Sequence, residues 1–372
     1  MDNIILKHPI RHDTYTEAVS KFYDLAKQDE SVTTIKNNIQ LPTSAWNVGV
    51  IYGSSGTGKT TLLKTFGKII KPSWNNEAIV SNFSPIAPQE VFALLSAVGL
   101  STVPAWLRPY TYLSNGEQFR ADLARVVMQN NDPILIDEFT SVVDRNVAKS
   151  ASYALAKYIR KQNKKVIVAS CHNDILEWLE PDWIYNPVSG ETYYPRGSLC
   201  RPKLDLEIFR CKYAAWEYFK SHHYLSETLN KAARCFMCTW NDVPVGFIAI
   251  LALPHPKLKN AWRATRMVVL PDYQGLGFGG KLADYMGSLI KARNGLFYRR
   301  IAHPAVISYN RKHNDLWAEI GAKSTKFSET SKLLSGSNQN GAWLQKLNRD
   351  TVGFKYIGPA ASFEESRLFY EG

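Results

Sequence analysis

A short apolar run at residues 45–51 leads into a glycine-rich loop, and an amphipathic stretch follows at 62–70. The loop has the spacing G-x-x-x-x-G-K-[ST] in the strand–loop–helix context that a phosphate-binding loop requires. Glycines let backbone N–H groups turn toward phosphate oxygens, and the start of the next helix adds the positive end of its dipole. The pattern predicts an α/β nucleotide-binding domain in the first half of the chain.

Each part of this loop has an expected role. The Lys59 amine should reach the β- and γ-phosphates of ATP, and the Thr60 hydroxyl should bind Mg²⁺. The predicted ATP-binding residues of the loop are Gly53, Ser54, Ser55, Gly56, Thr57, Gly58, Lys59, Thr60 and Thr61.

A second apolar strand, at residues 132–136, ends in two adjacent carboxylates, Asp137 and Glu138. Such a pair at a strand end is usually a solvated turn. After a phosphate loop it predicts instead that Asp137 holds Mg²⁺ through water and that Glu138 polarises the attacking water. Glu138 is therefore the predicted catalytic carboxylate of an ATPase.

Between these motifs, Leu-Ser-Asn-Gly-Glu-Gln begins at residue 113 and opens a predicted helix. Here the first half resembles the ABC ATPases, whose signature is Leu-Ser-Gly-Gly-Gln. Asp144 matches the family's D-loop, and His172, after the strand at 165–170, matches its switch histidine. Asn115 and Glu117 depart from the usual signature residues. Trp46 and Gln89 are candidates for the adenine-stacking aromatic and the glutamine loop, although a Trp beside a core strand is more often simple packing.

The resemblance implies an ATP-dependent head-to-tail homodimer. Each ATP would lie between the phosphate loop of one protomer and Ser114 and Gly116 of the other. No apolar run approaches the roughly 18 residues of a membrane span, so we expect no membrane domain. The ATPase would then belong with family members that act on nucleic acid, ribosomes or partner proteins.

The charge of the chain is unevenly distributed. Residues 1–195 hold 19 Lys and Arg and 19 Asp and Glu, whereas residues 196–372 hold 26 and 14, so the whole net charge of +12 lies in the second half. Turn-forming residues are frequent at 181–199, and we place the seam at 190–202. We predict an ATPase domain at 1–195 and a second domain at 196–372, whose basic character suits a polyanion such as nucleic acid. The alternative is that these basic side chains only form a solvated surface and bind no partner.

The second half contains predicted strands at 245–253 and 264–270, then Gln-Gly-Leu-Gly-Phe-Gly-Gly at 274–280 and a helix at 281–292. A glycine run alone could be a dinucleotide loop. The leading Gln, the preceding antiparallel meander and the lack of an initial βαβ unit favour another interpretation. This run resembles the acetyl-CoA pyrophosphate loop of the GNAT acyltransferases.

The GNAT resemblance implies an α+β fold with a mixed, mostly antiparallel sheet over about 205–330. The strand before the loop would lie beside the thioester and supply an oxyanion donor. The predicted acetyl-CoA residues are Val268, Val269, Gln274, Gly275, Leu276, Gly277, Phe278, Gly279 and Gly280. Many members carry a tyrosine general acid, but Trp317 stands at that position here, and Tyr309 is the predicted substitute.

Two histidines and a tyrosine near the start of the second half form another candidate site. His223 and Tyr224, with His222, are either structural or a catalytic or metal-binding set. This segment weakly resembles the Mom-type DNA-modifying acyltransferases of bacteriophages, and His303 could join such a site. Cys235 and Cys238 have no second ligand pair, so they read as core residues rather than a zinc site.

The five cysteines at 171, 200, 211, 235 and 238 are too few for a disulfide framework, and a cytoplasmic location is expected. Three functions remain open. The first is a nucleic-acid-directed acyltransferase that uses ATP, Mg²⁺ and acetyl-CoA, with ATP-driven dimerisation as a clamp. The second is an ATP-regulated acetyltransferase of proteins or small amines. The third is an ATPase whose GNAT fold only binds a ligand.

Overall fold

The computed structural model describes residues 3–23, 25, 28–129, 131–195, 204–223, 228–325 and 349–371. It divides into two compact units, one formed by Met1–Ser73 and Arg125–Pro202, the other by Trp74–Ala124 and Lys203–Gly372. The predicted seam at 190–202 lies at one of these divisions. Residues 74–124, which the sequence analysis assigns to the ATPase half, group instead with the second half.

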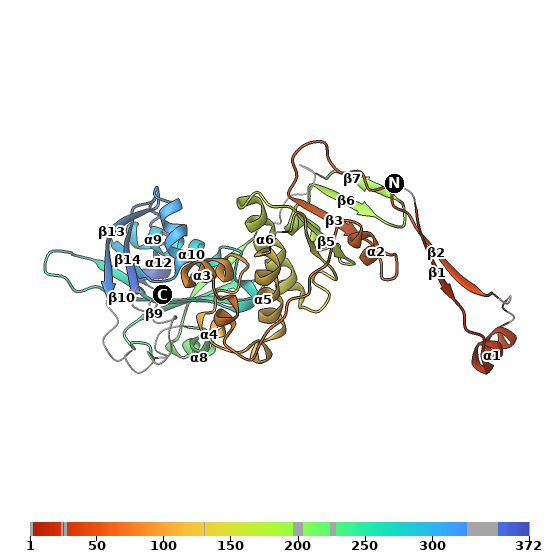
Figure 1. The fold of residues 1–372 in the computed structure, drawn as a ribbon. Helices are drawn as coiled ribbons and strands as arrows, with labels where there is room; N and C mark the ends of the chain where they lie inside the picture. Colours follow the sequence, from red (N-terminus) through yellow and green to blue (C-terminus); the bar gives the residue numbers. More distant parts are fainter. Residues whose placement is uncertain are drawn as a thin grey trace. The chain divides into compact units, whose positions relative to one another are not determined.

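The first unit is built on a five-stranded sheet with the order β4-β5-β3-β6-β7 (Figure 1). The pairs β4–β5, β5–β3 and β3–β6 are parallel, and β7 pairs antiparallel with β6. The strands and helices of this unit are β1 (Ile4–Pro9), α1 (Thr14–Phe22), β2 (Glu30–Ile35), β3 (Val48–Tyr52), α2 (Lys59–Lys64), β4 (Ile134–Ile136), α6 (Arg145–Lys161), β5 (Val166–Ser170), α7 (Leu176–Leu179), β6 (Trp183–Asn186) and β7 (Glu191–Tyr193).

The parallel strands of the first unit are almost fully buried. Every residue of β5 and the first four residues of β3 are buried, as expected where both faces of a parallel sheet are covered. A core on β3 includes Ile51, Leu62 and Trp183. Because parallel strands share a carboxyl edge, the loops that follow β3, β4 and β5 meet at one edge of the sheet.

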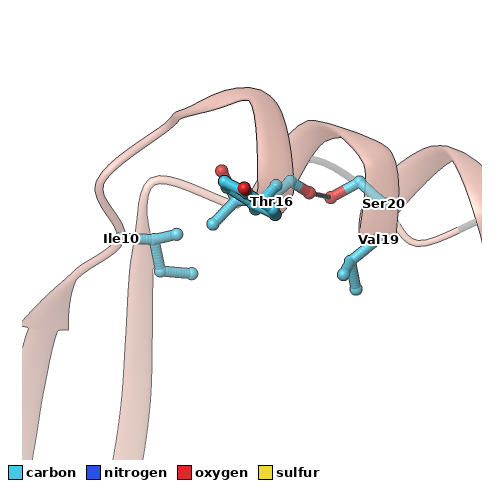
Figure 2. A pocket seen from close by; sticks show the side chains of 5 residues that line it. Ile10, Thr16, Val19 and Ser20 are labelled. Atoms are coloured by element: carbon cyan, nitrogen blue, oxygen red, sulfur yellow. Dashed lines mark hydrogen bonds between the residues drawn. The ribbon is translucent and has the colours of Figure 1, made fainter.

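A two-stranded ribbon, β1 with β2, carries α1 at its end (Figure 1). A hollow of about 290 Å³ lies beside α1 and is lined by Ile10, Tyr15, Thr16, Val19 and Ser20. Figure 2 shows four of these side chains, Ile10, Thr16, Val19 and Ser20, from close by. This lining contains no carboxylate, imidazole or amine. Its polar groups are the hydroxyls of Tyr15, Thr16 and Ser20.

The second unit contains a seven-stranded sheet with the order β13-β14-β12-β11-β10-β9-β8. All neighbours are antiparallel except β11 and β12, which confirms the mixed, mostly antiparallel sheet predicted for this half. Its strands and α-helices are α3 (Pro88–Ala97), α4 (Val103–Trp106), α5 (Asn115–Val127), which runs on into the first unit, β8 (Leu206–Cys211), α8 (Trp216–Phe219), β9 (Arg234–Trp240), β10 (Val243–Ala252), β11 (Ala261–Val269), α9 (Phe278–Lys291), β12 (Leu296–Ile301), α10 (Pro304–Lys312), β13 (Trp317–Thr325), β14 (Arg349–Tyr356) and α12 (Arg367–Tyr370).

The pairing of β11 with β12 is short. Only Ala261, Trp262 and Arg263 are in register with β12, whereas β11 continues to Val269 along β10. The two parallel strands therefore separate toward the end of β11, next to the glycine-rich loop. None of the described helices has the length and apolar character of a membrane span.

Candidate functional site

The phosphate loop joins β3 to α2 as predicted, although α2 is shorter than the expected helix at 62–70. Gly56 and Gly58 have φ of +80° and +86°, a region that L side chains rarely adopt. A Cβ on Gly58 would lie 2.5 Å from the Ile35 side chain, whereas one on Gly56 would meet nothing within 4 Å. Positive φ favours glycine at both positions, and the close Ile35 side chain also leaves no room for a Cβ at Gly58.

The two predicted magnesium-binding residues lie next to each other. The Thr60 hydroxyl donates to Asp137 Oδ1 at 3.1 Å, although the two are 77 residues apart in the chain. A hydroxyl beside a carboxylate fits Mg²⁺, which prefers oxygen ligands. The Lys59 amine donates to the Ser54 carbonyl at 2.7 Å, so it is held within the loop that it should serve.

Glu138 and His172 follow neighbouring strands of the same sheet. Glu138 is exposed after β4 and has a φ of +48°, and its N–H donates to Asp137 Oδ1. The Ser170 hydroxyl donates to the Phe139 carbonyl and accepts from the His172 N–H. This places the backbones of the predicted catalytic carboxylate and switch histidine at one edge, where they can face a γ-phosphate.

The structure places the three remaining ATPase candidates, Asp144, Trp46 and Gln89, in three different environments. Asp144 is the N-cap of α6 and accepts from the Asn146 N–H. Trp46 precedes β3, at the strand end opposite the phosphate loop, and packs edge-to-face on Trp183 at 5.6 Å. Packing, rather than adenine stacking, therefore accounts for Trp46. Gln89 is exposed in the first turn of α3.

The signature sequence forms the start of α5. The Ser114 N–H donates to the Glu117 carboxylate at 3.0 Å, and the Glu117 N–H donates to the Ser114 hydroxyl at 3.3 Å. This reciprocal pair is a capping box, a role that Glu117 fills as the usual glutamine would. Ser114 remains exposed, and Gly116 is buried in the first turn.

The glycine-rich loop of the second unit has the geometry expected for a pyrophosphate. Gly275 and Gly277 have φ of +95° and +86°, and Gly277 caps α9 without a side-chain hydrogen bond. A Cβ on Gly277 would meet nothing within 4 Å. No side chain caps the first N–H groups of this 14-residue helix, and the space beside Gly277 is open. An anion could therefore accept hydrogen bonds from these N–H groups.

Other predicted acetyl-CoA residues serve packing with their side chains. Gln274, Leu276 and Phe278 are buried, and Gly280 leaves room for the Tyr309 ring, which a Cβ would approach to 2.4 Å. Gly279 lies close to Val269, whose strand β11 is unpaired with β12 at this level. Val268 is buried, so its side chain is not available to a bound thioester.

The predicted general acid, Tyr309, is engaged by a carboxylate that the sequence analysis missed. Its hydroxyl donates to Asp284 Oδ2 at 2.5 Å, and the Trp317 indole N–H donates to Asp284 Oδ1 at 2.7 Å. Burial and the Asp284 carboxylate both raise the pKa of Tyr309 above its ordinary value. Asp284 thus holds both Tyr309, the predicted acid, and Trp317, which stands at the usual acid position, and no sequence pattern marks Asp284.

We expect Tyr309→Phe to retain release of CoA thiol from acetyl-CoA within about tenfold, because the hydroxyl proton is held by Asp284. The variant should lose about 1–2 kcal/mol of unfolding free energy, since one carboxylate oxygen loses its donor. Tyr110→Phe is the matched control, because the Tyr110 hydroxyl donates to Asp122 in the same unit. A hundredfold loss in Tyr309→Phe alone would identify Tyr309 as the acid.

The histidine cluster is only partly described. His223 is buried, with its ring 5.6 Å from that of Trp216, while His222 is half-buried and its pKa is lowered by burial. Tyr224 lies outside the described residues. His303 packs against Trp106 at 6.0 Å, so it faces α4 rather than a site shared with His223. Within the described ranges, no group of three or more His, Cys, Asp or Glu could hold a metal ion.

Cys235 and Cys238 are buried in β9, as core residues of a strand would be. Burial raises the pKa of Cys238 to about 11, which disfavours the thiolate form that zinc would need.

Comparison with known proteins finds relatives of two kinds. The profile of the acetyltransferase (GNAT) family matches residues 202–321. The lipoprotein-releasing system ATP-binding protein LolD of Rickettsia prowazekii is 25% identical over 230 residues, covering 51% of this chain and 98% of LolD. The achromobactin transport ATP-binding protein CbrD of Dickeya dadantii is 26% identical over 184 residues, covering 38% of this chain and 68% of CbrD.

Two solved structures are also similar. A dimeric ATP-binding cassette in a post-hydrolysis state with ADP and Pi is 17% identical, with a TM-score of 0.37, covering 46% of this chain and 95% of that one. A Bacillus subtilis acetyltransferase in complex with CoA is 14% identical, with a TM-score of 0.31, covering 41% and 97%.

The chain combines an ABC-type ATPase region with a GNAT acetyltransferase domain. The predicted cofactors, ATP with Mg²⁺ and acetyl-CoA, are those of these two families. The weaker resemblance to Mom-type enzymes stays a prediction.

Proposed function

We propose that this protein is an ATP-hydrolysing, acetyl-CoA-dependent acyltransferase that modifies nucleic acid at a DNA base. ATP would close a head-to-tail homodimer around the polymer, and hydrolysis would reopen it. The observation that supports a nucleic-acid substrate is the placement of the entire +12 charge in the half that carries the acetyl-CoA loop. Phosphate neutralisation by Lys and Arg supplies most of the non-specific affinity for such a polymer.

The ATPase step rests on the edge formed by the loops after β3, β4 and β5. Lys59 would bind phosphate oxygens, and Thr60 and Asp137 would hold Mg²⁺, which would neutralise the developing charge. Glu138 would orient water for in-line attack on the γ-phosphorus, and His172 would contact the γ-phosphate. Ser114 and Gly116 of the partner protomer would complete the site.

The acyl-transfer step rests on the loop at 274–280 and on the end of β11. The backbone N–H groups around Gly277 and Gly279 would bind the pyrophosphate, and acetyl-CoA when bound would supply the thioester. A backbone N–H of Val268 or Val269 would stabilise the oxyanion as the amine attacks the carbonyl carbon. The CoA sulfur leaves as the new bond forms, and its proton comes from the attacking amine through solvent or a side chain.

Nucleoside analysis tests the substrate class. DNA and RNA from cells that express the protein should contain a new acylated nucleoside by mass spectrometry. The same nucleosides should be unmodified in cells that express Gly277→Val, which should not bind acetyl-CoA. Unmodified nucleic acid together with newly acetylated proteins would show that the substrate is a protein.

We expect nucleic-acid binding by the full chain to weaken steeply with salt, because log K falls by about 0.9 per neutralised phosphate for each unit of log salt. Lys257→Glu with Lys259→Glu, two exposed lysines between β10 and β11, should reduce this slope. Lys68→Glu with Lys161→Glu, exposed lysines of the net-neutral half, is the control. A slope near zero for the unmodified chain would contradict the nucleic-acid proposal.

A second candidate function is an ATPase whose GNAT fold binds acetyl-CoA without transferring its acyl group. Trp317 cannot donate a proton to a thiolate, and the Tyr309 hydroxyl is held by Asp284, which favours this alternative over an ordinary amine acetyltransferase. Release of CoA thiol from acetyl-CoA by the purified protein in the presence of DNA would distinguish the two.

A further inference from the structure

The part of the ATPase that carries the signature sequence belongs to the same compact unit as the acetyl-CoA loop. That part comprises residues 74–124, including α3, α4 and most of α5. The contacts between it and the turn at 271–274, which directly precedes the glycines of the loop, are polar and buried. They join two segments that the sequence assigns to different activities.

Arg120 makes the first of these contacts. Its side chain is completely buried on α5, and its guanidinium donates to the carbonyls of Pro271 and Asp272, the latter at 3.0 Å. Burial lowers the pKa of Arg120 to about 10, so the side chain remains a cation at neutral pH. A buried cation is costly unless its donors are used, and here they hold the first two residues of the turn.

Gln274 makes the second contact. Its amide donates to the Thr102 hydroxyl and to the Val269 carbonyl, both at 2.9 Å, and its side-chain oxygen accepts from the Ser101 N–H at 2.7 Å. The backbones also approach closely, because a Cβ on Gly99 would lie 3.1 Å from the Gln274 carbonyl oxygen. Residues 99–102 therefore hold the other end of the turn.

The turn is thus held from both sides by the signature-bearing segment. α5 begins with the capping box of Ser114 and Glu117, so the signature and Arg120 are parts of one continuous helix. Asp122 on the same helix accepts from the Trp74 and Tyr110 side chains, which ties α5 to the rest of its segment. A shift at Ser114 must then move the carbonyls on which the acetyl-CoA loop is built.

We propose that the signature sequence and the acetyl-CoA loop form one allosteric unit, in which acetyl-CoA and ATP change each other's affinity. Arg120 and Gln274 are the positioning residues, because their buried side chains hold the two ends of the turn. This inference rests on the proposed function, in which ATP of one protomer binds Ser114 of the other. Linkage requires that the two ligands affect each other by the same factor, and such factors are typically about 5- to 150-fold.

The test uses full-length Glu138→Gln protein, in which ATP persists, and free CoA, which transfers no acyl group. Calorimetric titration should give CoA dissociation constants that differ at least fivefold with and without ATP and Mg²⁺. The ATP dissociation constant should change by the same factor when CoA is saturating. In Thr102→Val and in Arg120→Lys, each combined with Glu138→Gln, the ratio should fall toward one.

Ser96→Ala is the matched control, since its buried hydroxyl bonds to the Phe92 carbonyl within α3 and does not touch the turn. It should keep the full ratio, and melting temperatures should show that all variants are folded. If Arg120→Lys does not fold, Thr102→Val decides alone, because it removes one hydroxyl and preserves the side-chain shape.

Three results would overturn the inference. CoA and ATP that bind independently in the Glu138→Gln protein would refute the coupling and leave the proposed function intact, whereas absence of CoA binding would refute both. A full ratio in folded Thr102→Val and Arg120→Lys would show that neither contact transmits the coupling.

Discussion

Replacing Glu138 with Gln should lower ATP hydrolysis by about 10²- to 10⁴-fold, the usual contribution of a positioned base. The Glu138 side chain is exposed at the edge where the loops after β3, β4 and β5 meet. The side-chain amide of the substituted Gln has nearly the same shape as the carboxylate, but it cannot accept the proton of the attacking water. The neighbouring contact of Thr60 with Asp137 is untouched, so binding of ATP and Mg²⁺ should persist.

The consequence of slow hydrolysis is a long-lived ATP state. We expect Glu138→Gln to accumulate as a dimer when ATP and Mg²⁺ are added, as measured by light scattering after size exclusion. Lys59→Ala is the contrasting variant, because it removes the phosphate-facing charge and should remain monomeric with little ATP bound. Hydrolysis by Glu138→Gln at the unmodified rate would show that another group activates the water.

Replacing Gly277 with Val should abolish acetyl-CoA binding, with at least about a hundredfold loss of affinity. The residue has a φ of +86°, where a β-branched side chain is strained, and its side chain would project into the open space before α9. Calorimetric titration with CoA measures the loss directly. ATP binding should persist, because the phosphate loop lies in the other compact unit.

Gly321→Val is the matched control for this strain. Gly321 has a φ of +130° in an irregular part of β13, and a Cβ there also meets nothing within 4 Å. Both variants should lower the melting temperature, but only Gly277→Val should lose CoA. Unimpaired CoA binding by folded Gly277→Val would move the pyrophosphate site away from this loop.

The histidines show that a sequence pattern alone does not predict whether a histidine packs in the core or acts in a site. His222, His223 and His303 are each plausible ligands or bases as letters in a sequence. In the described structure His223 packs on Trp216 and His303 on Trp106, so the rings lie in different surroundings. Whether a histidine is a core residue or a catalytic group depends on its neighbours in space, and for His303 that neighbour, Trp106, lies far away in the chain.

The sequence by itself determined both glycine-rich loops, the strands before them and the presence of a helix after each, although not the extent of α2. These features depend on interactions between near neighbours: positive φ at Gly58 and Gly277, apolar runs that must be buried, and helix starts with bare N–H groups. The neighbouring positions of Thr60 and Asp137 were also predictable, because parallel strands share a carboxyl edge.

Only the tertiary structure decided the grouping of residues 74–124 with the second half and the engagement of Tyr309 by Asp284. Arg120 meets Pro271 across 151 residues, and no periodicity or spacing records such a pair. The physical reason is that a buried polar side chain must find a partner, but which partner it finds depends on how whole elements pack. The sequence specified two sites, and packing joined one of them to the signature of the other.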